Sequence, residues 1–171
     1  DDLRIITGQA PAALELQKEV GELDAIVCPV GGGGLASGTA LATRHVSPST
    51  EVVLGEPEAV DDAYRSLQAG HFIPGDDSPT IADGLKTSLG EHTYPIIRDY
   101  VTRIVTVSED EIIEAMRFIW TRMKLIIEPS SAVAIAAVCK DRDRLSGQQV
   151  GIIISGGNVD LDHLPWIKHP A

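Results

Sequence analysis

The chain has 171 residues and a mass of 18.2 kDa, a usual length for one domain with a packed core. Its 43% hydrophobic and 23% charged residues exclude disordered, collagen-like and disulfide-scaffold proteins. The longest unbroken apolar run, Ala132–Cys139, has eight residues, far fewer than the roughly 20 that a membrane-spanning helix requires. We therefore expect no membrane segment.

The net charge also excludes a class of partner. Twenty-five acidic and 14 basic residues leave a charge of −11, so a nucleic acid backbone would be repelled. Aromatic residues make up only 4% of the chain, too few for a base-stacking surface. The two cysteines, Cys28 and Cys139, lie in apolar stretches and are predicted to be reduced, unreactive core residues of a cytoplasmic protein.

Helices and strands are predicted to alternate along the chain. A helix is expected to begin at Pro11, a tolerated first-turn position, and to end at Gly21. The short apolar run Asp24–Val30 is typical of a strand buried on both faces of a parallel sheet. Glycines then interrupt the run, and the Ala- and Leu-rich segment 35–45 predicts the next helix. This unit is a strand, a glycine loop and a helix.

The same alternation continues to the end of the chain. Ser108 and Glu111 form a capping box, and apolar residues recur at helical spacing from Ile112 to Met123. The remaining predicted helices are 60–69 and 130–140, the latter buried between layers, and the remaining strands are 51–55, 103–107 and a central strand 150–154. The pattern predicts one layered α/β domain without internal repeats.

The glycine loop Gly31–Gly34 is the first candidate binding site. Backbone amides at the start of a helix carry the positive end of its dipole, and glycines let them surround a phosphate without side-chain obstruction. The alternative is structural, since glycines also occur where a strand turns sharply with positive φ. Taken alone, the loop leaves these two interpretations about equally supported.

Two cofactors compete for this loop. Gly31, Gly33 and Ala36 have the spacing of a dinucleotide-binding turn, and Glu56 stands where such a fold places its ribose-binding acid. A Walker phosphate loop is excluded, because no Lys-Ser or Lys-Thr pair follows the glycines. Pyridoxal phosphate is the second option, since its single phosphate needs only one amide-lined site.

The wider sequence favours the second option. Five motifs follow one another: Val30–Leu35, Gly55–Pro57, Ala82–Gly84, Glu128–Ala132 and Ser155–Asn158. In order and spacing they resemble the serine racemase and serine/threonine dehydratase family, pyridoxal-phosphate enzymes of the tryptophan-synthase-like fold. Tyr94–Asp99 and Arg122–Lys124 look especially like the serine racemase branch. The resemblance covers Leu3 to Leu161 and implies a three-layer α/β sandwich with a mostly parallel sheet, residues 1–171 forming the C-terminal part of the large domain.

The resemblance also implies roles for residues around the cofactor. The amides of Gly31, Gly32, Gly33, Gly34 and Leu35 would hold the phosphate, and Ser155 would hydrogen-bond the pyridine nitrogen. A neutral hydroxyl does not favour a protonated ring as a carboxylate does, which suits β-elimination and racemisation. Without the resemblance, Ser155 is equally a turn residue at a strand end. Glu128 would lie near the cofactor ring.

A divalent cation site is implied as well. Glu56 and Asp62 match two carboxylate ligands of the family, and the carbonyl of Val60 matches a third ligand, an all-oxygen set suited to Mg²⁺ or Ca²⁺. From the residues alone, these acids are better interpreted as a capped helix start near a positive dipole end.

Further residues have weaker assignments. Lys124 and Asn158 match positions that contact an activating nucleotide in animal serine racemases. The five histidines, His45, His71, His92, His163 and His169, show no metal-binding spacing and are expected at the surface. Asp160, Asp162 and His163 are expected to be solvated rather than to bind a cation.

The family's catalytic lysine has no counterpart in this sequence. In the family, a lysine in a Ser-x-Lys-x-Arg-Gly context forms the Schiff base, and Lys18, Lys86, Lys124, Lys140 and Lys168 do not lie in such a context. The chain also opens without Met or a signal-like segment. We therefore expect the C-terminal half of a lyase or racemase that acts on serine or threonine, inactive alone, paired with an N-terminal fragment, and a homodimer at full length. The alternatives are a non-catalytic pyridoxal phosphate-binding or regulatory module and, more remotely, an NAD-dependent dehydrogenase domain.

Overall fold

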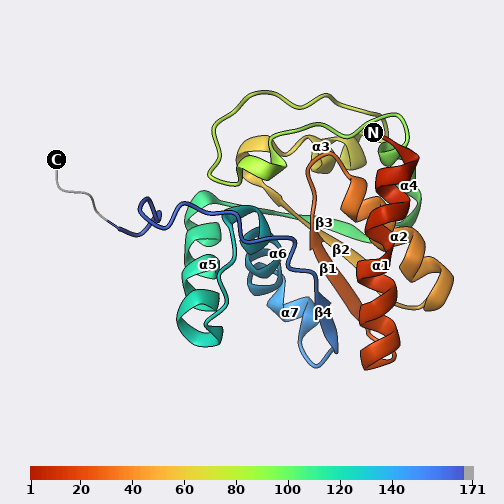
Figure 1. Ribbon diagram of the computed structural model, residues 1–171. Helices are drawn as coiled ribbons and strands as arrows, with labels where there is room; N and C mark the ends of the chain where they lie inside the picture. The colour runs from red at the N-terminus through yellow and green to blue at the C-terminus, as the bar shows by residue number, and fades with distance from the viewer. Residues whose placement is uncertain (168–171) are drawn as a thin grey trace.

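The fold is built on a parallel β-sheet (Figure 1). The structure, a computed structural model, describes residues 1–167. Its strands are β1 (Ala25–Pro29), β2 (Glu51–Pro57), β3 (Arg103–Val107) and β4 (Val150–Ile152), in the order β3-β2-β1-β4. Every pairing between these strands is parallel. The predicted α/β class is confirmed.

Helices cover both faces of this sheet, as Figure 1 shows. They are α1 (Leu3–Val20), α2 (Gly34–Val46), α3 (Asp62–Ala69), α4 (Thr93–Tyr100), α5 (Glu109–Met123), α6 (Pro129–Lys140) and α7 (Arg142–Leu145). Because side chains alternate along a strand, Val27 and Val53 pack with α5 and α6, whereas Ile26 and Leu54 pack with α1 and α2. Three layers result, as the resemblance implied. None of the described helices is long and apolar enough to cross a membrane.

Small residues bring α6 close to the sheet. Eight consecutive residues of α6, Ser130–Ala137, are buried. A Cβ atom at Gly55 of β2 would lie 2.8 Å from the carbonyl oxygen of Val133, so glycine is what permits this contact. The predicted buried helix is therefore confirmed, and so is the capping box of α5, in which Ser108 and Glu111 exchange hydrogen bonds.

The first helix begins eight residues earlier than predicted. Asp2 accepts a hydrogen bond from the backbone N–H of Arg4 at 2.8 Å and caps α1 at Leu3. Pro11 therefore lies inside the helix, where proline costs about 3 kcal/mol. Close packing against α2 offsets that cost: a Cβ at Gly38 would lie 2.6 Å from the carbonyl oxygen of Ile6. The start of this helix therefore depends on its contact with α2, which the local sequence does not reveal.

The last strand was predicted as a central strand over 150–154, and both parts of that prediction are wrong. β4 spans only Val150–Ile152 and lies at the edge of the described sheet. One more hydrogen bond follows, from Ile153 N–H to the carbonyl of Val27 at 2.9 Å, and Ile154 is then exposed. The hydrophobic pattern predicted that a strand forms here, but it did not predict which strands lie beside it in the sheet.

Two differences concern helices. The helix predicted over 60–69 begins two residues later, as α3 at Asp62, and a 3₁₀ turn, Glu58–Val60, precedes it. Helix α4 was not predicted; its Pro95 lies in the first turn, where the missing N–H has no intrahelical role. A proline at this position is therefore compatible with a helix.

The two cysteines differ in exposure. Cys28, in β1, is fully buried, and burial raises the pKa of its thiol to about 12. Cys139 lies in the last turn of α6 and is exposed, so its predicted place in the core is wrong. The buried part of α6 ends at Ala137, before the helix reaches this residue.

Thiol labelling should distinguish the two side chains. We expect a disulfide-exchange reagent at mildly alkaline pH to modify one thiol per native chain and two per urea-unfolded chain, because only thiolates react. Cys139→Ser should abolish the native reaction, whereas Cys28→Ser should leave it unchanged. Rapid labelling of Cys28 in the folded protein would contradict its described burial.

Candidate active site

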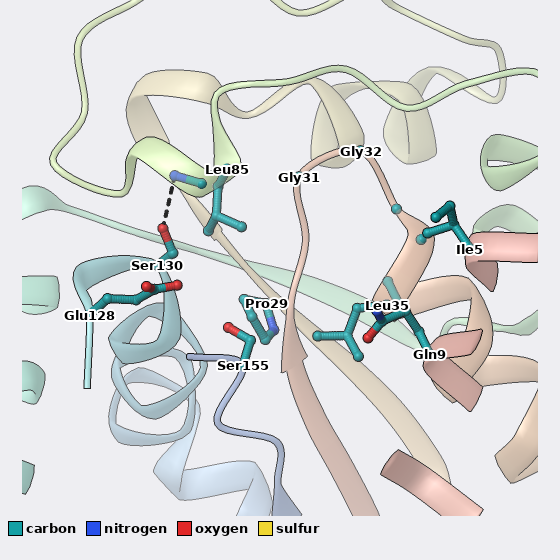
Figure 2. Close-up of a pocket in the computed structure, with 14 residues that line it drawn as sticks. Ile5, Gln9, Pro29, Gly31, Gly32, Leu35, Leu85, Glu128, Ser130 and Ser155 are labelled. Carbon is teal, nitrogen blue, oxygen red and sulfur yellow. Dashed lines mark hydrogen bonds between the residues drawn. The ribbon is translucent and has the colours of Figure 1, made fainter. Parts of the chain in front are cut away.

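A cavity of about 320 Å³ opens where β1 and β4 end (Figure 2). Its lining residues come from distant parts of the chain: Ile5, Gln9, Pro29, Gly31, Gly32, Gly33, Gly34, Leu35, Ala36, Gly84, Leu85, Glu128, Ser130 and Ser155. In Figure 2, Ile5 and Gln9 project from α1 on one side, and Glu128 and Ser130 lie at the start of α6 on the other. The cavity thus contains every residue predicted to contact the cofactor.

The glycine loop (Gly31–Gly34) forms one wall and leads directly into α2. Gly33 has a φ of +83°, in the left-handed region, and caps the helix without a side chain. The first intrahelical bond runs from Ser37 N–H to the Gly33 carbonyl at 2.8 Å. The amides that precede Ser37 lack an intrahelical acceptor, so they and the positive end of the helix dipole face the cavity.

The opposite wall approaches the glycine loop very closely. A Cβ atom at Gly31 would lie 2.9 Å from the Cα of Leu85, and one at Gly33 would lie 2.8 Å from the Thr93 Cβ. The dashed line in Figure 2 marks a hydrogen bond from the Gly84 N–H to the Ser130 hydroxyl, 3.1 Å long. It connects the Ala82–Gly84 motif to the start of α6. The glycines are therefore required by close backbone approach as well as by a turn.

Ser155 lies at the cavity floor, three residues after β4. Its hydroxyl is 3.0 Å from that of Ser131 in α6. Ser155 is exposed, so the hydroxyl is accessible to a bound molecule. Ser155 therefore follows the end of a strand and also lines the cavity.

Glu128 lines the same cavity from the N-cap position of α6. Its carboxylate does not cap that helix; it accepts the N–H of Asn158 at 2.7 Å. Its own N–H donates to the carbonyl of Gly156 at 3.2 Å. Glu128 therefore fixes the glycine-containing segment that follows Ser155.

The predicted cation ligands lie outside the cavity lining. Glu56, only 1% exposed, accepts the N–H groups of Ala63 and Tyr64 at 2.9 and 2.8 Å and so holds the start of α3. Asp62, 2% exposed, accepts the N–H of Leu89 at 3.3 Å. Val60 is buried in the preceding 3₁₀ turn. These hydrogen bonds agree with the interpretation from the residues alone, in which the acids stabilise the start of a helix.

These acids have perturbed proton affinities. Burial raises the pKa of Glu56 to about 8, although the two backbone hydrogen bonds lower it, and the charges of Asp62 and Asp61 raise it further. Burial also raises the pKa of Asp62, against a hydrogen bond from Leu89. Within residues 1–167, no group of three His, Cys, Asp or Glu side chains is arranged to hold a metal.

The other predicted residues are outside the cavity. Lys124 is exposed, has a φ of +59°, and donates through Nζ to the Thr121 carbonyl at 2.7 Å. Asn158 lines a separate hollow near Asp83 and His163. The structure does not place Lys124 among the residues of either hollow.

The described histidines lie at the surface, as predicted. His45, His71, His92 and His163 are exposed, and His163 contacts Asp160 at 2.7 Å. His169 and Lys168 lie outside the described residues. Among residues 1–167, no lysine lines the cavity.

Sequence reasoning missed several lining residues: Ile5, Gln9, Pro29, Ala36, Leu85 and Ser130. Leu85 directly follows the recognised motif Ala82–Gly84, and Ser130 lies within the recognised motif Glu128–Ala132, although no role was predicted for either residue. Ile5 and Gln9 had no such signal. They reach the cavity because α1 extends back to Leu3, which the prediction of a later helix start concealed.

Comparison with known proteins identifies the family. Residues 1–156 match the model of the family described as pyridoxal-phosphate dependent enzyme. The chain belongs to this family. Membership removes the NAD-dependent dehydrogenase alternative, in agreement with Glu56, which is buried against α3 rather than available to a ribose.

Curated relatives narrow the comparison. The chain is 46% identical over 166 residues to a β-hydroxyaspartate dehydratase of Paracoccus denitrificans, covering 97% of this chain and 53% of that protein. It is 49% identical over 172 residues to a serine racemase of Dictyostelium discoideum, covering 98% and 53%. The chain therefore spans about half the length of these relatives.

Solved structures agree in fold. The crystal structure of the Dictyostelium discoideum serine racemase superposes with a TM-score of 0.88 at 49% identity, over 94% of this chain and 52% of the other. That of a T.th. threonine deaminase gives 0.90 at 46% identity, over 94% and 61%. The fold is that of the fold type II pyridoxal phosphate enzymes.

The residues of the cavity fit this cofactor. The glycine loop presents the unpaired backbone amides at the start of α2 without side chains, and an added Cβ atom at Gly31 or Gly32 would collide with Leu85 or Thr87 at 2.9 Å. A hydroxyl, Ser155, stands at the other end of the same cavity. An anion-binding helix start and a polar group for a ring nitrogen are the two features that this pyridine phosphate requires.

Replacing Gly33 with alanine should damage the fold and the cavity together. The left-handed φ costs roughly 1–2 kcal/mol for alanine, and the contacts at 2.8 Å add about 1–3 kcal/mol of overpacking. We expect urea unfolding to report a loss of about 2–5 kcal/mol. Gly8→Ala is the matched control: Gly8 lies inside α1 with nothing within 4 Å, so alanine should stabilise by roughly 0.5–1 kcal/mol. Equal stability of the Gly33 variant would refute the described loop geometry.

Proposed function

We propose that this chain is the C-terminal half of a pyridoxal phosphate enzyme that dehydrates or racemises a hydroxy amino acid. The observation that carries the proposal is one cavity holding both the glycine loop and Ser155. Relatives named as serine racemases, as a threonine deaminase and as hydroxyaspartate lyases support serine, threonine or hydroxyaspartate as substrate. All three carry a hydroxyl on the β-carbon.

In this proposal the glycine loop binds the cofactor phosphate. The amides of Gly31–Gly34 and Leu35 and the dipole of α2 supply the attraction. The packed wall at Leu85 excludes water from one side of this site. Pyridoxal phosphate, when bound, supplies an electron-withdrawing ring that stabilises negative charge at the substrate α-carbon. The protein's part is to fix the ring against that carbon.

Ser155 is proposed to face the pyridine nitrogen, and Glu128 to lie beside the ring. Both residues line the cavity; the Glu128 carboxylate accepts the N–H of Asn158, and the Ser155 hydroxyl contacts that of Ser131. A proton acceptor for the α-carbon is not among the proposed roles of these residues. That role requires a lysine supplied from outside this chain, in the Ser-x-Lys-x-Arg-Gly context of the family.

We also propose a divalent cation at Glu56, Asp62 and the Val60 carbonyl. Each carboxylate oxygen that accepts one backbone N–H retains a second lone pair for a cation. Oxygen-only ligands suit Mg²⁺ or Ca²⁺. Since Asp62 holds Leu89 and Leu89 packs against Gly33, a cation here would brace the wall of the cofactor cavity. Nucleotide binding by Lys124 and Asn158, a homodimer at full length and a cytoplasmic location remain expectations of the same proposal.

Ligand binding and complementation test the catalytic proposal. The isolated chain should bind pyridoxal phosphate reversibly, bind pyridoxal at least tenfold more weakly because it lacks the phosphate, and release no 2-oxo acid from serine or threonine. Adding a polypeptide that carries the lysine motif should restore 2-oxo acid formation or racemisation. Robust lyase activity of the isolated chain would refute the proposal. Cofactor binding without activity under any complementation would favour the non-catalytic module.

Glu56 should make stability depend on pH when chelator removes cations. Its pKa of about 8 in the folded chain, against about 4.5 unfolded, means that the folded chain retains a proton the unfolded chain releases. The free energy of unfolding should therefore fall as pH rises from about 4.5 to about 8, by on the order of a few kcal/mol.

Urea titrations across that range measure the effect. Glu56→Gln should flatten the pH dependence, and Asp143→Asn, at a 99% exposed side chain, should not. Mg²⁺ or Ca²⁺ should restore stability at the alkaline end in wild type and not in the Glu56 variant. Equal cation effects in both proteins would remove Glu56 from the site.

A further inference from the structure

One polar side chain of the cavity has no partner within the described chain. The polar side chains that line the cavity are those of Gln9, Glu128, Ser130 and Ser155. Glu128 and Ser130 each accept a backbone N–H, and Ser155 contacts a neighbouring serine hydroxyl. Within residues 1–167, the carboxamide of Gln9 makes no hydrogen bond. Its two N–H groups and its carbonyl oxygen are therefore available to a bound molecule.

Close contact between α1 and α2 fixes the position of Gln9. A Cβ atom at Gly38 would lie 2.6 Å from the carbonyl oxygen of Ile6 and 3.1 Å from the carbonyl carbon of Gln9. A Cβ atom at Gly34, one turn earlier in α2, would lie 3.0 Å from the side chain of Ile5, one turn earlier in α1. The two helices therefore begin side by side and run in the same direction along this contact.

This arrangement directs Gln9 toward the glycine loop. Side chains of an α-helix tilt toward its N-terminus, so the side chain of Gln9 extends over the turn that begins at Ile5. Ile5 in turn packs against Gly34, the first residue of α2. Figure 2 shows Gln9 projecting from α1 on the same side of the cavity as Leu35. Gln9 thus extends toward the first amides of α2, which lack intrahelical acceptors.

We propose that Gln9 donates a hydrogen bond from its Nε2 atom to the cofactor phosphate. The inference rests on the proposed function, in which the glycine loop holds that phosphate. An ionised phosphate oxygen can only accept a hydrogen bond, so the N–H groups of the carboxamide, and not its carbonyl oxygen, would face it. Gln9 would thereby add a side-chain donor to a site whose other donors are backbone amides.

The composition of the cavity makes this donor important. Among the described lining residues none is Lys or Arg, and the carboxylate of Glu128 opposes an anion. A hydrogen bond from a neutral donor to an ionised acceptor is roughly twice as strong as one between two neutral groups. Because Gln9 belongs to α1 and the loop amides lead into α2, the phosphate would be bound by two helices that Gly38 allows to pack closely.

A second glutamine provides a matched control. Gln68 is exposed in α3 and does not line the cavity. Replacing either glutamine with leucine removes an exposed carboxamide from a helix and leaves the helix propensity nearly unchanged. Both variants should therefore fold as the wild type does, which circular dichroism and urea unfolding verify.

The test compares pyridoxal phosphate, pyridoxal and inorganic phosphate as ligands of the chain. We expect Gln9→Leu to weaken pyridoxal phosphate binding about tenfold, the lower end for one hydrogen bond to a charged group. The inhibition constant of inorganic phosphate, measured as a competitor of pyridoxal phosphate, should rise by the same factor, and pyridoxal binding should not change. Gln9→Glu keeps the shape but adds a like charge, so it should weaken pyridoxal phosphate binding more than Gln9→Leu. Gln68→Leu should match the wild type for every ligand.

The outcomes separate this inference from the proposed function. Equal losses of pyridoxal and pyridoxal phosphate affinity in Gln9→Leu would overturn the inference, because a structural role or a contact to the ring would affect both ligands. A wild-type preference for pyridoxal phosphate that survives both Gln9 substitutions would refute the inference alone. If the wild type bound pyridoxal phosphate no better than pyridoxal, the proposed phosphate site and this inference would fail together.

Discussion

The parallel register of the sheet is the constraint on which the site depends. β1 pairs with β2 on one side and with β4 on the other, so all three strands end at one edge. The glycine loop leaves β1 at this edge, and Ser155 follows β4 there. Two motifs more than 100 residues apart in the sequence therefore line one cavity. In open α/β sheets this edge is the general position of ligand sites, for the same geometric reason.

Close backbone approach then shapes the cavity. Gly31 touches the Leu85 backbone, and Leu89 packs against Gly33, at distances that a side chain would prevent. The buried carboxylate of Asp62 holds the N–H of Leu89, so a polar group on α3 secures the segment that covers the loop. Glu56 in turn secures the start of α3. The acids that we propose as cation ligands are thereby connected by hydrogen bonds to the segment that packs against the glycine loop.

Local sequence predicted the features that are local in the structure. The strand, glycine loop and helix around Gly31–Gly34 depend on adjacent residues, as does the capping box at Ser108, and both are present. The motifs also identified Ser155 and Glu128, which do line the cavity. Their roles remain predictions, because position in a cavity does not assign a contact to a ligand.

The errors share a physical origin. The start of α1 depends on contact with α2 at Gly38, and the edge position of β4 depends on which strands pair. Cys139 has apolar sequence neighbours, yet it stands in the last turn of α6, beyond the buried segment. Each of these depends on which other segment lies nearby in space. The hydrophobic pattern shows how apolar a segment is, but it does not show which other segments pack against it in the folded chain.

The proposed phosphate site differs in character from the net charge of the chain. The chain carries a charge of −11, and among the described residues that line the cavity none is Lys or Arg, while Glu128 adds a carboxylate. A phosphate held here would depend on backbone amides and the dipole of α2, which act within about one helical turn. The distant acids are screened by solvent over roughly 10 Å at ordinary ionic strength. For the proposed phosphate site, local backbone geometry set by four glycines would therefore have to outweigh both the net charge of the molecule and the carboxylate of Glu128.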